Sequence, residues 1–224
     1  MPDKLYISIQ YYLTMGQRMN WRHPSGFHEK MNWLKIHYRR PLLTQLVDKY
    51  AVRDYVAERI GKQYLVPLIG KWNLAEEIDF DSLPEKFVLK CNHGSHDVTI
   101  CLDKQLLDRN RVRANYRRWL RRNLYPAYRE WPYKNVEPCI ICEQFIETRS
   151  DGGIPSDYKF TCFNGQVDSV MLCMERGTGD TKFYFFDRDW HLLRYNKRGL
   201  AAPADFTLPK PEGLDRMFEL AAVL

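Results

Sequence analysis

Lys90 and the turn that follows it are the residues whose types and spacing best suit the binding of an anion. Four of the five residues Phe87–Cys91 are apolar, which predicts a strand, and Lys90 is the exception. Residues 92–97 then form a turn rich in hydrogen-bond donors, where Gly94 would let the main chain approach a phosphate closely. Taken alone, these residues fit a plain hairpin turn equally well. A Walker-type phosphate loop is excluded, because there the lysine follows the glycines and a helix comes next.

A second candidate anion site is the segment 103–123, whose apolar residues have helical spacing. A face this basic is either simply solvated or docks onto phosphate or uronate groups, and both interpretations remain open. The segment carries seven arginines: Arg109, Arg111, Arg113, Arg117, Arg118, Arg121 and Arg122.

The composition describes a globular chain with excess positive charge. Its 224 residues suffice for one large domain or two small ones, and 45% hydrophobic with 28% charged residues is ordinary. The net charge of +6 favours an anionic partner, which includes phosphate, a polyanionic glycan, an acidic membrane surface and nucleic acid. No run approaches the roughly 20 apolar residues of a membrane span, and no signal peptide is recognisable.

The six cysteines indicate a reduced, cytoplasmic protein. Most lie in apolar, strand-like runs, as buried free thiols do. Cys139 and Cys142 are spaced like zinc ligands, but no second pair accompanies them, so a zinc site is not expected.

The remaining segments predict a mixture of helices and strands. Residues 1–40 look helical and irregular, with aromatic and basic residues interleaved, which nucleic-acid-binding segments also show. A helix is expected from residue 44 to 60, with Gly61 as its terminator. Asn164-Gly165 predicts a tight hairpin within 158–174. Further strands are expected at 64–69, 98–102, 138–147 and 182–186, followed by an amphipathic helix carrying Leu214, Met217, Phe218 and Ala221.

Six short blocks occur in one order along the chain: 27–30 with 33–37, 48–53, 87–95, 129–135, 143–146 and 157–160. Together they resemble the teichuronic-acid-biosynthesis (TupA-like) family of the ATP-grasp superfamily, over nearly the whole chain from about residue 20. The resemblance implies an α+β fold in which two lobes hold ATP between antiparallel sheets. We therefore expect an N-terminal helical region with part of the first lobe at 1–84, a nucleotide-clamp lobe at 85–146, and second-lobe strands with the terminal helix at 147–224.

The same resemblance implies roles for individual residues. Arg53 would contact phosphate, and Lys90 would reach the α- and β-phosphates and adenine N7. The loop that closes over the terminal phosphates would contain His93, Gly94 and Ser95. The hinge that pairs with the adenine edge would be Glu143, Gln144, Phe145 and Ile146, with Glu143 on the adenine amino group. Lys159 would point toward phosphate or acceptor.

The function that the resemblance implies is ATP-dependent ligation of a carboxylate to an amine or hydroxyl group, in the synthesis of a bacterial surface or exported polysaccharide. The substrate would be an anionic sugar or a lipid-linked glycan, with peripheral membrane association as a consequence and no specific nucleic acid as partner. It would be held by the arginines Arg117, Arg118, Arg121 and Arg122.

Two departures from the family pattern bear on these expectations. The loop usually has a second glycine where this chain has His96, and the acids that bind Mg²⁺ would be expected beyond the last helix, whereas the sequence stops at Leu224. We therefore expect a C-terminally incomplete second lobe and no identifiable Mg²⁺ ligands.

Two alternatives remain. One is a glycosyltransferase or sugar-nucleotide-binding accessory protein of the same pathway, with Asp187-Arg188-Asp189 as the sole Asp-x-Asp candidate. The other is a basic nucleic-acid-binding module.

Overall fold

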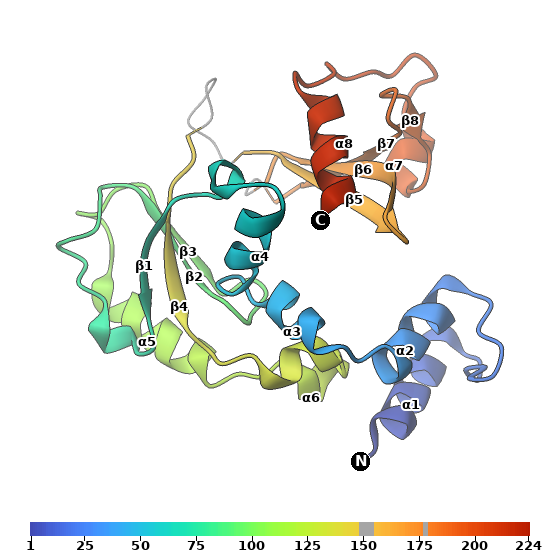
Figure 1. Cartoon of the computed structure of the whole chain (residues 1–224), viewed down its shortest axis with the longest axis horizontal. Helices are drawn as coiled ribbons and strands as arrows, with labels where there is room; N and C mark the ends of the chain where they lie inside the picture. The colour runs from blue at the N-terminus through green and yellow to red at the C-terminus, as the bar shows by residue number, and fades with distance from the viewer. Residues whose placement is uncertain (148–154, 177–178) are drawn as a thin grey trace. The chain divides into compact units, whose positions relative to one another are not determined.

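The computed structural model describes residues 1–147, 155–176 and 179–224 of the chain. These residues form helices and two four-stranded antiparallel sheets, which confirms the predicted α+β class (Figure 1). The chain divides into two compact units, each described by itself below. Unit 1 contains Met1–Tyr55 and Val66–Phe145, and unit 2 contains Val56–Leu65 and Ile146–Leu224.

Unit 1 is built around a sheet with the strand order β1-β4-β2-β3. Its strands are β1 (Leu68–Trp72), β2 (Phe87–Cys91), β3 (Val98–Cys101) and β4 (Ile140–Gln144). Its helices are α1 (Asp3–Met15), α2 (Phe27–His37), α3 (Pro41–Val47), α5 (Arg109–Leu120) and α6 (Tyr125–Tyr128), with short 3₁₀ turns η2 (Ala75–Glu77) and η3 (Trp131–Asn135). The unit boundary Tyr55/Val56 falls within α4 (Val52–Arg59).

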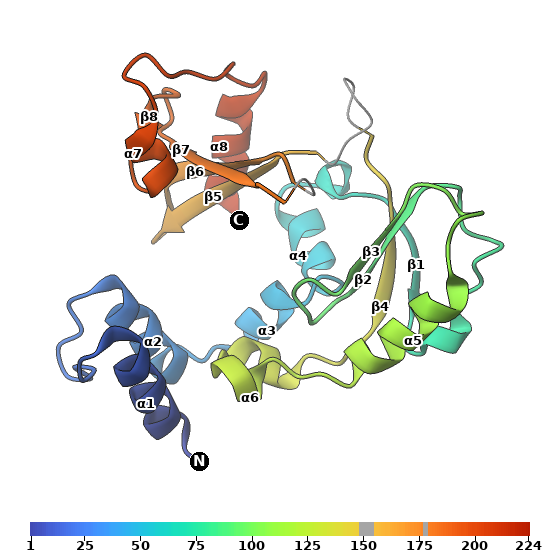
Figure 2. The ribbon, with the colours of Figure 1, turned by 180° about the vertical axis from the view of Figure 1, so that it is seen from behind.

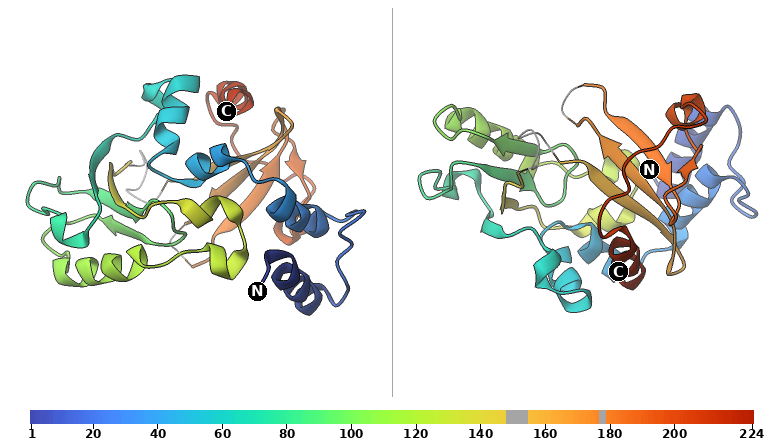
Figure 3. Two further views of the ribbon diagram at one scale, coloured as in Figure 1. Left: turned by 60° about the horizontal axis from the view of Figure 1, so that its bottom comes forward. Right: turned by 90° about the horizontal axis from the view of Figure 1, so that it is seen from above.

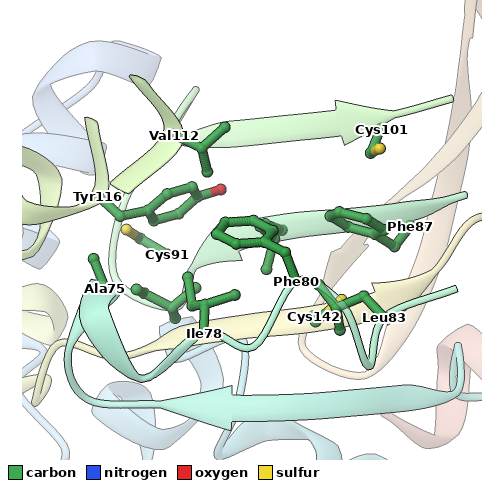
Figure 4. Packing of buried hydrophobic residues seen from close by; sticks show 12 residues of the cluster. Ala75, Ile78, Phe80, Leu83, Phe87, Cys91, Cys101, Val112, Tyr116 and Cys142 are labelled. Atoms are coloured by element: carbon green, nitrogen blue, oxygen red, sulfur yellow. The ribbon is translucent and has the colours of Figure 1, made fainter. Parts of the chain in front are cut away.

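One face of this sheet carries the main hydrophobic core. Side chains alternate along β2, so Phe87, Leu89 and Cys91 point to one side, where each is at most 1% exposed. Helix α5 covers that side, and its Val112 and Tyr116 pack among the strand residues (Figure 4). Figure 2 shows α5 running beside the strands. Because the core occupies one face, Lys90 is left on the other.

Unit 2 contains the second sheet, in the order β5-β6-β7-β8. The predicted hairpin is confirmed: Asn164 and Gly165 have φ of 50° and 77° and connect β5 to β6, as a primed turn requires. The predicted terminal helix is also confirmed, and its Phe218 packs edge-on against Phe160. The elements are η1 (Lys62–Tyr64), β5 (Asp157–Phe163), β6 (Gln166–Met174), β7 (Lys182–Phe186), β8 (Leu192–Leu193), α7 (Lys197–Ala201) and α8 (Leu214–Val223).

The prediction of one helix from residue 44 to 60 is wrong, because the chain breaks into α3 and α4. At the break, the Asp48 carboxylate accepts the backbone N–H groups of Tyr50 (2.8 Å) and Ala51 (3.2 Å). An aspartate side chain that accepts hydrogen bonds from nearby backbone N–H groups stabilises a turn, which competes with the hydrogen bonds of a helix. The helix then restarts at Val52 and ends before Gly61, whose φ is 106°.

The first strand also begins later than predicted. Residues Lys62–Tyr64 form a 3₁₀ turn directly after Gly61, so the strand runs from Leu68 to Trp72 instead of from 64 to 69. It lies at the edge of the sheet, where the proline before it, Pro67, is tolerated.

Candidate functional site

The face of the unit 1 sheet opposite the main core brings several of the predicted site residues together. Directly opposite residues on neighbouring strands share a face. One row across the sheet therefore contains Lys71, Ile141, Lys90 and Val98, from β1, β4, β2 and β3 in turn. The next row on the same face contains Leu68, Glu143, Val88 and Ile100. Lys90 and Glu143 consequently lie on neighbouring strands, one row apart.

At the centre of this face, two cations share one carboxylate. The Lys90 Nζ lies 2.5 Å from Glu143 Oε2, and the Arg53 Nη1 lies 3.1 Å from Glu143 Oε1. The other Arg53 nitrogen, Nη2, donates to the carbonyl of Val66 at 2.7 Å. The three side chains are 23%, 15% and 10% exposed for Lys90, Arg53 and Glu143. Two positive groups against one negative group leave a local excess of one positive charge, which suits a bound anion.

The break between α3 and α4 explains how Arg53 reaches the sheet and identifies a residue that the sequence reasoning missed. At the break, the backbone N–H of Lys49 donates to Asn92 O (3.1 Å), and its Nζ donates to Gly94 O (2.5 Å). Burial lowers the pKa of Lys49, and the nearby Lys90 lowers it further. Lys49 therefore holds the turn from outside the sheet. The sequence signal that could have identified Lys49 is its position in the same charged segment as Asp48 and Arg53.

Asn92 holds the base of the turn between β2 and β3. It is 1% exposed, its Nδ2 donates to Glu137 O (2.9 Å), and its Oδ1 accepts the backbone N–H of Cys139 (2.8 Å). The backbone N–H of Asn92 also donates to Cys139 O at 3.0 Å. These contacts fix the residues just before β4 to the start of the turn.

The turn buries its first residues and exposes the next two. His93 is 4% exposed and its Nδ1 lies 3.1 Å from Asn92 Oδ1, and Gly94 is also buried. Ser95 and His96 are exposed, with Ser95 Oγ 3.0 Å from His96 Nδ1. In this conformation Ser95 and His96, rather than the His93 ring, present polar side chains outward. His96 has φ of 67°, in the left-handed region where the family pattern places a glycine.

Two further contacts restrict the turn. A Cβ on Gly94 would lie 2.1 Å from Asp97 Oδ2, so only glycine fits there without a shift. The other Asp97 oxygen, Oδ1, accepts from Arg122 Nη1 at 3.2 Å, and Asp97 is 5% exposed. Burial lowers the pKa of His93, while backbone groups at Trp119 and Arg122 and the Asp97 carboxylate oppose that shift.

The predicted hinge residues follow β4 out of unit 1. The Gln144 backbone N–H donates to Pro67 O at 3.0 Å, which extends the pairing with β1 by one residue. Phe145 is buried, and Ile146, the first residue of unit 2 in this part of the chain, is 52% exposed. Whether their main-chain groups pair with an adenine remains a prediction.

Exposed apolar side chains flank the charged cluster. Leu68, Val98 and Ile100 are 37%, 41% and 40% exposed, and by register they share the face of Lys90 and Glu143. Leu68 lies on the edge strand β1, whereas Val98 and Ile100 lie together on the other edge strand, β3. The pair on β3 offers an apolar surface beside Lys90, which suits an aromatic base attached to phosphates.

The arginines predicted to hold an anionic substrate do not share this face. Helix α5 packs on the core side of the sheet, and several of its arginines already have partners within unit 1. Arg117 pairs with Glu76, and Arg118 Nη2 donates to Asn115 Oδ1 at 3.2 Å. Arg121 is exposed, and only Arg122 reaches the turn, through Asp97. A glycan-binding role for these four residues remains a prediction.

The acids that the sequence offered for Mg²⁺ or a sugar nucleotide lie in unit 2, as does Lys159. Lys159 is an exposed residue of β5 with its Nζ 3.8 Å from Asp157 Oδ2. The Asp187 carboxylate accepts the backbone N–H of His191 at 2.8 Å, and Glu175 Oε1 lies 2.5 Å from Lys182 Nζ. Among the residues that the structure describes, no three His, Cys, Asp or Glu side chains are grouped to hold a metal ion, so the expected Mg²⁺ is not assigned to any of them.

Comparison with known proteins identifies one family. The model of the family described as TupA-like ATPgrasp matches residues 29–224, which includes every block that carried the resemblance except the first two residues of the first block. No curated protein and no solved structure matches the chain.

Proposed function

Because the chain belongs to the TupA-like ATP-grasp family, we propose that it uses ATP to join a carboxylate to an amine or hydroxyl group in the synthesis of a surface or exported polysaccharide. Membership of the family implies ATP binding. The ligation, the pathway and the acceptor are the proposed part.

The observation that carries the proposal is the Arg53–Glu143–Lys90 cluster on the face of the sheet opposite the main core. It places two fixed cations beside the exposed apolar pair Val98 and Ile100 of β3, as a nucleotide with its phosphates requires. The residues present therefore fit ATP. Lys90 and Arg53 would hold phosphate oxygens, and Val98 and Ile100 would lie against the base.

The cluster also suggests how the site changes when a nucleotide enters. Both oxygens of Glu143 are engaged, one by Lys90 and one by Arg53. A phosphate competes with Glu143 for Lys90, and the released Glu143 oxygen becomes free to accept an N–H of the adenine amino group. Since one anion replaces another beside the cations, the exchange avoids leaving a charge unpaired.

ATP would supply a phosphoryl group that converts the substrate carboxylate into an acyl phosphate. The carboxylate oxygen bonds to the γ-phosphorus as ADP leaves, and the amine or hydroxyl then bonds to the carbonyl carbon as phosphate leaves. Lys90 and Arg53 would stabilise negative charge on the phosphates, and positioning with charge neutralisation provides most of the catalysis in such reactions.

The test is release of ADP that depends on a carboxylate acceptor. Wild-type protein with ATP, Mg²⁺ and a panel of uronic acids is expected to release ADP, and hydroxylamine is expected to trap the acyl phosphate as a hydroxamate. Lys90→Met should abolish both signals, while Lys30→Met, which removes an exposed lysine of α2, should leave them unchanged. ADP release that no carboxylate stimulates, with no hydroxamate, would contradict ligation.

A further inference from the structure

Helix α1 has apolar residues on two opposite sides, and one side has no cover in the described part of the chain. Ile7 and Tyr11 face inward, where they are 4% and 6% exposed and pack near Trp33 of α2. Figure 3 shows α1 lying beside α2. At about 100° per residue, the positions 5, 9, 12 and 13 lie on the opposite side. This outer stripe consists of Leu5, Ile9, Tyr12 and Leu13, which are 52%, 43%, 55% and 72% exposed.

The outer stripe continues into a hollow formed with the turn after α1. The hollow has a volume of about 460 Å³, and Ile9, Tyr12, Leu13, Met19 and Trp21 line it together with the exposed Arg18. The Trp21 indole donates from Nε1 to Ser8 Oγ at 2.9 Å, which fixes the ring at the edge of the hollow. A soluble helix normally places polar side chains on its outer side, so an apolar stripe with a hollow marks an interaction surface.

The charges around the stripe are strongly one-sided. Residues 1–40 carry seven basic and two acidic side chains, a net charge of +5 in a chain whose net charge is +6. Both acids are engaged inside unit 1. Asp3 bonds to Arg39 at 2.6 Å, and Glu29 accepts the backbone N–H groups of Asn20 and Ser25, each at 2.9 Å. The surface around the stripe is therefore basic.

We propose that the outer stripe of α1, together with the turn through Trp21, docks in the plane of an anionic membrane surface. A helix of 13 residues is about 20 Å long, too short to cross a bilayer, and no helix among the described residues is long and apolar enough to do so. An apolar stripe flanked by basic and aromatic residues is the pattern of a helix that lies in the interface.

A second copy of the chain is the less suitable occupant. A symmetric dimer through the stripe would bring exposed basic side chains such as Lys4 and Arg18 of both copies together, and like charges oppose such a contact. An anionic lipid surface instead pairs with Lys4, Arg18 and Arg22, all exposed near the stripe. Membrane docking does not depend on the nucleotide site, so its failure would leave the proposed ligation untouched.

The test is co-sedimentation of the full chain with vesicles of phosphatidylcholine alone or with about one-third phosphatidylglycerol. The wild type should bind the anionic vesicles and lose most of that binding at about 0.5 M salt. The double variant Ile9→Ser/Leu13→Ser should bind at least tenfold more weakly, whereas Leu106→Ser, which changes a leucine 83% exposed on another surface, should bind like the wild type. Arg18→Gln should weaken binding about fivefold, since one basic side chain contributes about that factor, and Arg111→Gln of α5 should have no effect.

Two further measurements separate docking from misfolding and self-association. Brominated lipids should quench the wild-type tryptophan fluorescence, and Trp21→Phe should remove most of that quenching while retaining the circular dichroism of the wild type. Absence of binding to anionic vesicles would overturn the proposal. So would binding that the double serine variant retains, or a dimer in sedimentation velocity that the double serine variant abolishes.

Discussion

The charged cluster on the sheet face opposite the main core predicts a large and non-additive effect of replacing Glu143. Glu143→Gln keeps the shape of the side chain but leaves Arg53 and Lys90, 15% and 23% exposed, without their counter-ion. Breaking a buried ion pair costs about 3–5 kcal/mol, whereas an exposed pair contributes about 0–1 kcal/mol. Since the cluster lies between these limits, we expect Glu143→Gln to lower the free energy of unfolding by about 2–3 kcal/mol.

Removal of the lysine alone should cost less. In Lys90→Met, Glu143 retains its 3.1 Å contact with Arg53, so we expect a loss of about 1–2 kcal/mol. The double variant leaves only Arg53, which still donates to Val66 O. The decrease in the free energy of unfolding in the double variant should therefore be about 1–2 kcal/mol smaller than the sum of the decreases in the two single variants.

Urea unfolding followed by tryptophan fluorescence measures these changes mainly in unit 1, because five of the six tryptophans lie there. Asp81→Asn is a matched control. It removes the acid of the Arg109–Asp81 pair, whose side chains are 40% and 79% exposed, and should change stability by less than about 0.5 kcal/mol. If Glu143→Gln cost no more than this control, or if the two cluster losses simply added, the electrostatic coupling inferred for the site would be refuted.

Three further predictions concern the turn between β2 and β3. His96→Gly should raise the free energy of unfolding by about 0.5 kcal/mol, because φ of 67° strains histidine more than glycine, and a lower urea midpoint would contradict this. Gly94→Ala should lower it by about 1–3 kcal/mol, since the new Cβ would lie 2.1 Å from an Asp97 carboxylate oxygen, and an unchanged midpoint would count against the tight turn. Burial lowers the pKa of His93 in the folded state, so the unfolded state binds more protons below about pH 6.5. The free energy of unfolding should therefore decrease as the pH is lowered through this range, by at most about 1.4 kcal/mol per pH unit. His93→Gln should reduce that slope in urea unfolding measured at several pH values, whereas His23→Gln, at an exposed position, should retain it.

Local patterns predicted the elements that surround the site. The apolar residues of Phe87–Cys91 predicted a strand, and the structure forms β2 there, with Lys90 on the face opposite Phe87, Leu89 and Cys91. Asn164-Gly165 predicted the hairpin of unit 2, and the order of the short blocks predicted the family. The strand and the hairpin depend on residues close together in the chain, where periodicity and turn chemistry are informative.

Features that depend on distant contacts were not predictable in the same way. The apolar spacing continues from α3 into the break, so it cannot show that Asp48 ends the helix and delivers Lys49 to the turn. The burial of His93 follows from its position between Asn92 and α5, which a turn sequence does not show. Likewise, the strand order decides that the arginines of α5 lie on the side of the sheet opposite Lys90, and that order comes from pairings far apart in the sequence.

Titration of the protein with ATP by calorimetry tests the central claim most directly. The wild type should bind ATP, and Lys90→Met should weaken binding about 10- to 100-fold, because a hydrogen bond to a charged group contributes about 1.5–3 kcal/mol. The control Lys30→Met should bind like the wild type. A wild-type protein that shows no heat of ATP binding, or a Lys90→Met variant that binds ATP with unchanged affinity, would contradict the assignment of this sheet face as the nucleotide site.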